Sequence, residues 1–228
     1  MICENLRIIW ERIDKAAKKS GRSKDDITLV AVSKTFPVEK IIEAYECGHK
    51  VFGENRVQEA LKKIEIVKER QLDIDFHLIG HLQTNKVRYL KDNFSLIQSV
   101  DRVEVADLIN RRATKIGYKQ SILIQVNIAR EEQKSGVLME NLNELIDFVV
   151  ASENLVFSGF MMIPPLVHNP EDNRKYFSEM KKLYDTYKDS YGLKYLSMGM
   201  SDDFEIAIEE GSNMVRIGSA IFGKREYK

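Results

Sequence analysis

Apolar residues in this chain follow two patterns: segments with a helical repeat, and short unbroken runs. From residue 6 to residue 17 they recur at the three- to four-residue interval of one helix face, and Ser20-Gly21 ends the pattern. This predicts an amphipathic helix over residues 4–19. The next apolar run, residues 27–33, is rich in β-branched side chains and predicts a buried strand.

Strand-like and helix-like segments alternate from there to the end of the chain. The predicted strands are 27–33, 50–52, 76–79, 95–98, 121–127, 155–161, 195–198 and 214–217. The predicted helices between them are 37–46, 56–69, 84–90, 101–116, 140–150, 172–187 and 202–209, and a short segment closes the series. Near-continuous apolar strands are typical of a parallel sheet covered on both faces. We therefore predict an α/β fold, a single (β/α)₈ TIM barrel with an extra N-terminal helix; an open doubly wound sheet is the alternative.

Composition narrows the class of protein. The 228 residues, 43% hydrophobic, can bury one substantial core, so one domain over 1–228 is expected. Lys plus Arg and Asp plus Glu are 35 each, which gives no net field to attract nucleic acid or a membrane. We see neither a signal peptide nor an 18-residue apolar stretch, and expect a cytoplasmic protein. Cys3 and Cys47 are too few for a disulfide framework or a four-ligand zinc site, so reduced thiols are expected.

Lys34 ends the apolar run of the first predicted strand, where a lysine has no evident packing purpose. A site partly shielded from water disfavours the ammonium form and lowers the pKa of a lysine, as a Schiff-base nucleophile requires. The alternative is a lysine that only solvates the end of the strand. Position alone does not separate the two interpretations.

A phosphate site is predicted at the ends of the last two strands, because all strand ends of a barrel face one mouth. Gly199 and Gly218 allow a close backbone approach, and Ser201 and Ser219 add hydroxyl donors before predicted helices. Helix capping by the two serines is the alternative. Barrels often bind phosphate after strands seven and eight, which favours the first interpretation.

Arg216 lies in the last apolar strand, where an unpaired guanidinium would be costly. It could pair with Asp202 or Glu205, or face a ligand between Lys34 and the predicted phosphate site.

Other polar segments give weaker signals. His77 and His81 have no third ligand nearby, so no metal site is predicted. The charged segment 130–136 is interpreted as a surface loop from which Lys134 could reach the mouth. The methionines 161, 162, 198 and 200 are expected to fill gaps in the core.

Five separated motifs together resemble the pyridoxal phosphate homeostasis proteins, also called YggS or PROSC proteins, which look like the barrel domain of alanine racemases standing alone. The motifs are AVSK at 31–34, GENRVQE at 53–59, HLIGHLQTNK at 77–86, SMGMS at 197–201 and VRIG at 215–218. The resemblance covers nearly the whole chain, in order.

This resemblance implies a cofactor, pyridoxal 5′-phosphate (PLP), and a set of cofactor-binding residues. Lys34 would hold PLP as an aldimine, and Ser201, Gly218, Ser219 and the Met200 backbone would bind its phosphate. Arg216 would face the pyridine nitrogen, and Asn55 would lie near the cofactor. No residue is assigned a catalytic role, and the role of the loop at 129–136 stays open.

The resemblance also favours PLP homeostasis over catalysis. An arginine beside the ring nitrogen cannot accept the pyridinium proton, which makes the ring a poorer electron sink. The second acid/base of the racemases is a tyrosine from a domain after the barrel, and the chain stops at Lys228; nothing in the sequence supports Tyr227 as a substitute. We expect a monomer that buffers PLP and delivers it to apo-enzymes. A PLP-dependent racemase is the alternative function, and a Schiff-base aldolase is a more distant one.

Overall fold

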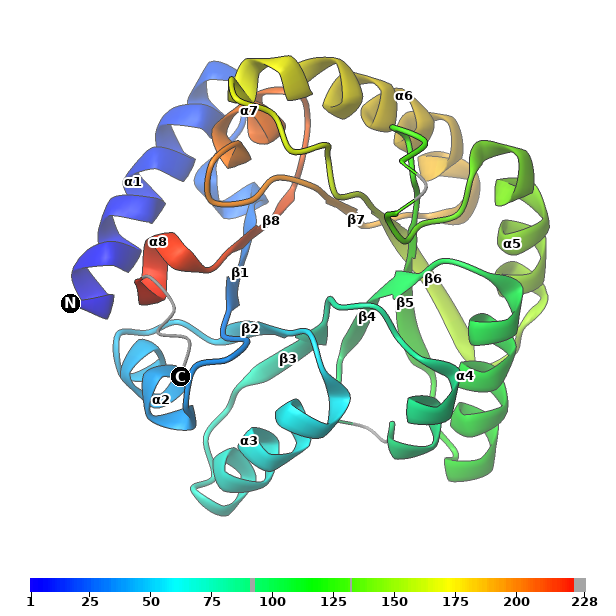
Figure 1. The fold of residues 1–228 in the computed structure, drawn as a ribbon. Coiled ribbons are helices and arrows are strands. Elements are labelled where there is room, and N and C mark those ends of the chain that lie inside the picture. The colour runs from blue at the N-terminus through cyan, green and yellow to red at the C-terminus, as the bar shows by residue number, and fades with distance from the viewer. Residues whose placement is uncertain (91–92, 132, 224–228) are drawn as a thin grey trace.

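The strands of the protein close into a parallel barrel in a computed structural model that describes residues 1–90, 93–131 and 133–223. The eight strands follow one another around the barrel in chain order, and β1 pairs in parallel with β8 (Figure 1). They are β1 (Thr28–Val32), β2 (Val51–Glu54), β3 (Asp75–Leu78), β4 (Leu96–Val100), β5 (Gln120–Gln125), β6 (Leu155–Met161), β7 (Tyr195–Ser197) and β8 (Met214–Ile217). The predicted barrel is confirmed, and the open sheet is excluded.

Helices form a ring outside the strands (Figure 1). The α-helices are α1 (Ile2–Lys19), α2 (Val38–Glu46), α3 (Val57–Glu69), α4 (Val103–Ile116), α5 (Met139–Ala151), α6 (Arg174–Tyr191), α7 (Phe204–Glu209) and α8 (Ser219–Phe222). The 3₁₀ helices are η1 (Lys24–Asp26), η2 (Thr84–Tyr89) and η3 (Pro170–Asn173). The helix expected at 84–90 is thus a 3₁₀ helix, in keeping with the low helix propensity of Thr84 and Asn85 at its start.

The extra helix α1 completes the ring beside β8. Helix α8 has only four residues, too few to cover a strand, and α1 packs against α2, α7 and α8. The Asn5 side chain donates to the Ile221 carbonyl at 2.8 Å, and Arg12 pairs with Glu205 at 2.7 Å. The helix that begins the chain therefore stabilises the place where the barrel closes.

The barrel interior is apolar at one level and polar at another. Val30, Leu96, Leu123, Met161 and Met214 form a small core of their own, distinct from the larger one that packs strands against helices. Met161, Met162 and Met198 are buried, as expected of core methionines, whereas Met200 is half-buried. Buried polar side chains also lie on the strands, among them His77 of β3, Gln98 of β4, Ser197 of β7 and Arg216 of β8.

The expectation of two reduced thiols is wrong for this structure. Cys3 of α1 and Cys47, at the end of α2, form a disulfide, with their Cα atoms 5.3 Å apart. The residues are 44 positions apart in the chain, so only the packing of α1 against α2 brings them together. A count of cysteines could not show that contact.

Candidate functional site

Lys34 lies in a tight turn directly after β1 and is half-buried. The next residue, Thr35, has φ 68°, an unfavourable conformation for a β-branched side chain. Its amide donates to Glu59 Oε1 at 2.7 Å, which holds the turn against α3. A strained turn anchored in this way fixes the direction in which Lys34 leaves the strand.

A buried ionic cluster supports the base of that turn. Lys63 Nζ, from α3, donates to the Ser33 carbonyl at 2.9 Å, to Glu54 Oε1 at 2.7 Å and to Glu59 Oε1 at 2.8 Å. Ser33 Oγ also donates to Glu54 Oε1, at 2.6 Å. Burial raises the pKa of Glu54 above its usual value, and Lys63 and Ser33 oppose the shift by stabilising the carboxylate.

Sequence reasoning did not single out Lys63. The signal was available, because Ala60, Lys63, Ile64 and Val67 share the apolar face of α3. A lysine on such a face needs a buried partner.

Residues of the predicted phosphate site meet between β7 and β8. Ser201 Oγ lies 3.4 Å from the Gly218 amide nitrogen, which donates to it, and 3.3 Å from Ser219 Oγ. Helices α7 and α8 have six and four residues, so the hydroxyls and the Gly218 amide, rather than helix dipoles, are the main donors. Packing also requires glycine at position 199: the residue has φ +95°, and a Cβ at this position would lie 2.6 Å from Ala207 Cβ.

Arg216 is buried in the barrel interior, 4% exposed. It donates through Nη1 to Ser197 Oγ at 2.6 Å and through Nη2 to the Met162 carbonyl at 2.8 Å. Burial lowers the pKa of Arg216 to about 10, and the charge of Asp203 acts in the opposite direction. Neither expected ion pair fits these contacts, because Glu205 pairs with Arg12 and Asp202 is exposed.

A chain of polar side chains continues from Arg216 across the barrel. Ser197 Oγ donates to Gln98 Oε1 at 2.7 Å, and Gln98 Nε2 lies 3.0 Å from His77 Nδ1. His77 Nε2 is 3.5 Å from Asp75 Oδ2, at the opposite end of β3. These contacts fix the rotamer of Ser197 and so the position of the Arg216 guanidinium. His77 is thus the strand residue that was expected, but the role of Gln98 and Ser197 was not foreseen.

Met200 and Asn55, the other predicted cofactor residues, border the same mouth. The Met200 amide donates to Asp203 Oδ1 at 2.7 Å, so its part in holding a phosphate stays a prediction. Asn55 follows β2, and its carbonyl packs closely on Gly80: a Cβ added to Gly80 would lie 2.3 Å from the Asn55 carbonyl oxygen.

Burial raises the pKa of Asp203, while hydrogen bonds from Met200 and Asn173 limit the rise.

The loop after β5 brings Lys134 toward this face of the barrel. Lys134 Nζ donates to the Pro164 carbonyl at 2.8 Å and pairs with Glu131 at 2.6 Å. It lines a small cavity together with Met200 and Asp203. Asn127 holds the loop, because its side chain donates to the Glu131 carbonyl at 2.9 Å.

Two absences apply to the described residues. Within the ranges 1–90, 93–131 and 133–223, no group of three or more His, Cys, Asp and Glu side chains could hold a metal ion. In the same part of the chain, no helix combines the length and the hydropathy needed to span a bilayer.

Comparison with known proteins places this arrangement in a family. The family model described as the N-terminal domain of alanine racemase matches residues 5–226. A protein of Aquifex aeolicus named pyridoxal phosphate homeostasis protein is 50% identical over 99% of this chain and 99% of its own. An Escherichia coli K12 protein of the same name is 39% identical over 99% of this chain and 97% of its own.

Solved structures agree with these sequence matches. PipY of Synechococcus elongatus, determined with PLP bound, has 30% identity and a TM-score of 0.85, over 98% of this chain and 100% of that one. Alanine racemase from Corynebacterium glutamicum has a TM-score of 0.71 at 15% identity, over 96% of this chain and 62% of that one, and shares the fold alone. The chain belongs to the pyridoxal phosphate homeostasis protein family, whose fold is that of the alanine racemase N-terminal domain.

Proposed function

We propose that this protein binds PLP reversibly and covalently through Lys34, buffers the reactive aldehyde inside the cell and delivers the cofactor to apo-enzymes. The observation that carries the proposal is the pairing of β1 with β8. This pairing brings the strand that precedes Lys34 next to the strand that precedes Gly218 and Ser219, so an amine and a set of anion donors share one mouth.

The residues present fit a phosphate ester. Ser201, Gly218 and Ser219 contribute two hydroxyls and one amide, joined to one another only by long contacts of 3.3 and 3.4 Å. A phosphate oxygen accepts shorter, charge-assisted hydrogen bonds and would replace these contacts with stronger ones. Asp203, a buried carboxylate two residues after Ser201, accepts hydrogen bonds from the Met200 amide and the Asn173 side chain.

Arg216 supports a binding role rather than carbanion chemistry. Bound PLP supplies an aldehyde and a ring whose capacity as an electron sink depends on a protonated ring nitrogen. Arg216 keeps two N–H groups on Ser197 and Met162, and it is a cation with no proton acceptor to offer. A ring nitrogen beside such a group would stay unprotonated, and carbanion stabilisation would be weakened.

Absorbance spectroscopy tests the assignment of Lys34. Purified protein mixed with PLP should show the visible band of a lysine-linked cofactor, and borohydride should abolish it. Lys34→Ala should lose the band, and Lys15→Ala, which removes an exposed lysine on α1, should keep it. A Lys34→Ala protein that keeps the covalent adduct would contradict the proposal.

Racemisation is the competing function. It needs a second acid/base, and Tyr227, the residue considered above, lies outside the described residues. Incubation of the PLP-loaded protein with single enantiomers of amino acids, followed by optical activity, separates the two functions. Turnover that disappears in Lys34→Ala would favour the racemase.

A further inference from the structure

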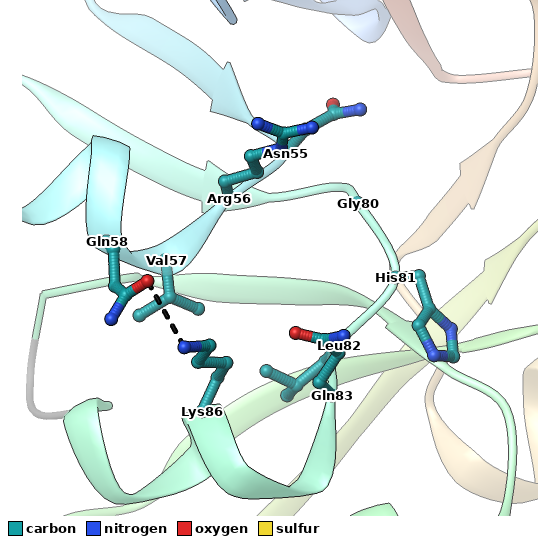
Figure 2. Close-up of a pocket in the computed structure, with 9 residues that line it drawn as sticks. All are labelled: Asn55, Arg56, Val57, Gln58, Gly80, His81, Leu82, Gln83 and Lys86. Atoms are coloured by element: carbon teal, nitrogen blue, oxygen red, sulfur yellow. Dashed lines mark hydrogen bonds between the residues drawn. The ribbon is translucent and has the colours of Figure 1, made fainter.

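A pocket of about 470 Å³ opens between the segment after β2 and the segment after β3. This is within the size range of small-molecule sites. Figure 2 shows its wall, which includes the side chains of Asn55, Arg56, Gln58, His81, Gln83 and Lys86. Asn55 also belongs to the candidate cofactor site, so the pocket adjoins the barrel mouth. None of the roles given to Lys34, Arg216 or Ser201 uses it.

The pocket wall is cationic. Arg56 and Lys86 line it, and the described residues that line it include no carboxylate. Since the chain as a whole has as many acidic as basic residues, 35 of each, this is a local excess of positive charge.

Neither Arg56 nor Lys86 has an anionic partner among the described residues. Lys86 Nζ donates to the neutral Gln58 Oε1 at 3.2 Å (Figure 2). In the described part of the chain, the Arg56 guanidinium makes no hydrogen bond or ion pair, and only the Arg56 carbonyl is bonded, to the Ala60 amide at 3.0 Å. Arg174, by contrast, pairs with Glu171, Glu209 and Glu210 at 2.7 to 2.8 Å.

Carboxylates near the pocket in the described structure have partners other than Arg56 and Lys86: Asp101 Oδ1 pairs with Arg102 at 2.6 Å, and Asp101 Oδ2 lies 3.6 Å from His81 Nδ1. Glu59 Oε1 accepts from the Thr35 amide at 2.7 Å and from Lys63 at 2.8 Å, and Glu54 is fully buried against Ser33 and Lys63. Burial raises the pKa of Glu59, but bonds from Lys63 and the Thr35 amide lower it further, so the net shift is downward. The charge of Arg56 adds a smaller lowering effect, without an ion pair between the two residues. In the described structure neither Arg56 nor Lys86 therefore pairs with a carboxylate. Lys86 Nζ lies 5.9 Å from the centre of the Tyr89 ring, and both charges remain available to a ligand.

The start of α3 adds a second source of positive potential. This helix has 13 residues, and Val57 and Gln58 of its first turn line the pocket. Its N-cap, Arg56, makes no side-chain capping bond to the helix amides. Amide groups at a helix start that lack a cap favour an anion.

We propose that this pocket binds the oxyanion of a small molecule, a carboxylate or a phosphate, at a site separate from the predicted cofactor phosphate site. The guanidinium of Arg56 can hold two oxygens of either group, and Lys86 supplies a second charge. Contact of Asn55 with Gly80 joins the two walls and keeps the pocket open. The inference does not depend on covalent PLP binding at Lys34.

Titration of the full-length apo-protein, followed by NMR, tests the pocket with inorganic phosphate and succinate as separate probes. At least one probe should give saturable shifts at the Val57 and Gln58 amides and the His81 imidazole. Arg56→Gln and Lys86→Gln should each weaken that binding at least about tenfold, as loss of a charge-assisted contact implies. The matched control is Lys62→Gln, an exposed lysine of the same helix that does not line the pocket.

The probe that binds more tightly identifies the ligand class as a phosphate or a carboxylate. Phosphate bound at the cofactor site would shift Gly218 and Ser219 instead, and Ser201→Ala isolates that effect. The proposal is overturned if neither probe saturates the pocket signals, or if Lys62→Gln weakens binding as much as the two pocket variants. Absorbance at Lys34 is measured separately, so a failed cofactor assignment would leave this result unaffected.

Discussion

Arg216 and Asp203 carry opposite charges in a place that excludes water. Burial shifts both pKa values toward the neutral forms: that of Arg216 is lowered to about 10 and that of Asp203 is raised. Each group attracts the other and so limits the shift of its neighbour. Burying both charges costs desolvation energy, so we expect the pair to be present for its role in the candidate site and not because it stabilises the fold.

The raised pKa of Asp203 makes the free energy of unfolding depend on pH, and the direction of the shift determines the sign of that dependence. Its native pKa is above the unfolded value of about 3.9. Its contribution to stability is therefore complete below the unfolded pKa and is lost as the pH rises through the native pKa. We expect the free energy of unfolding of the wild type, relative to Asp203→Asn, to fall as the pH rises from about 4 toward 7.

Urea denaturation of both proteins across that pH range measures the difference. Asp147→Asn is the control, because it removes the same charge from an exposed residue of α5 that does not act on Asp203. A difference between wild type and Asp203→Asn that is flat or grows with pH would refute the prediction.

At the scale of elements, the disulfide links α1 to the end of α2, a link that the sequence did not predict. Cys3 lies in the first turn of α1, and Cys47 directly follows α2. Closing a loop of 44 residues reduces the entropy of the unfolded chain, an effect of about 2–4 kcal/mol in typical proteins. Cys3→Ser should therefore lower the free energy of unfolding by about that amount under oxidising conditions.

Addition of a reductant provides the internal control. Reduced wild type and Cys3→Ser should then unfold at nearly the same denaturant concentration. Thiol titration of the oxidised, unfolded wild type should find no reactive cysteine. Two reactive thiols, together with equal stabilities before reduction, would show that the link does not form in solution.

The strands that carry the candidate site were predictable, because the parallel strands of a barrel follow one another in chain order and all end at the same mouth. Once residues 27–33 and 214–217 were identified as strands of a barrel, Lys34, Gly218 and Ser219 had to share one mouth. Contacts within the barrel were not predictable in the same way. The sequence pattern gives no indication that Ser197, rather than Asp202, binds Arg216, because that choice depends on which side chains of β7 and β8 point inward.

For the whole molecule, barrel closure and the proposed cofactor site depend on the same contact. Strand β1 pairs with β8 from Thr28 to Ala31, and a Cβ at Gly218 would lie 3.2 Å from the Val32 carbonyl. Helix α1 lies outside this side of the barrel and packs against α2, α7 and α8 (Figure 1). A ligand held by both Lys34 and Ser219 would bridge the first and last strands, and would oppose their separation on unfolding.

Thermal unfolding measures that bridge. A ligand that binds only the folded protein, present at about 100 times its Kd, adds about 2.7 kcal/mol to stability. For a chain of this size, about 2–4 °C of Tm per kcal/mol corresponds to a rise of about 5–10 °C with PLP. Lys34→Ala should lose most of the rise, because only phosphate contacts remain, and Ser201→Ala should lose a smaller part. An equal rise in wild type and Lys34→Ala would mean that PLP stabilises the barrel without joining its first strand to its last.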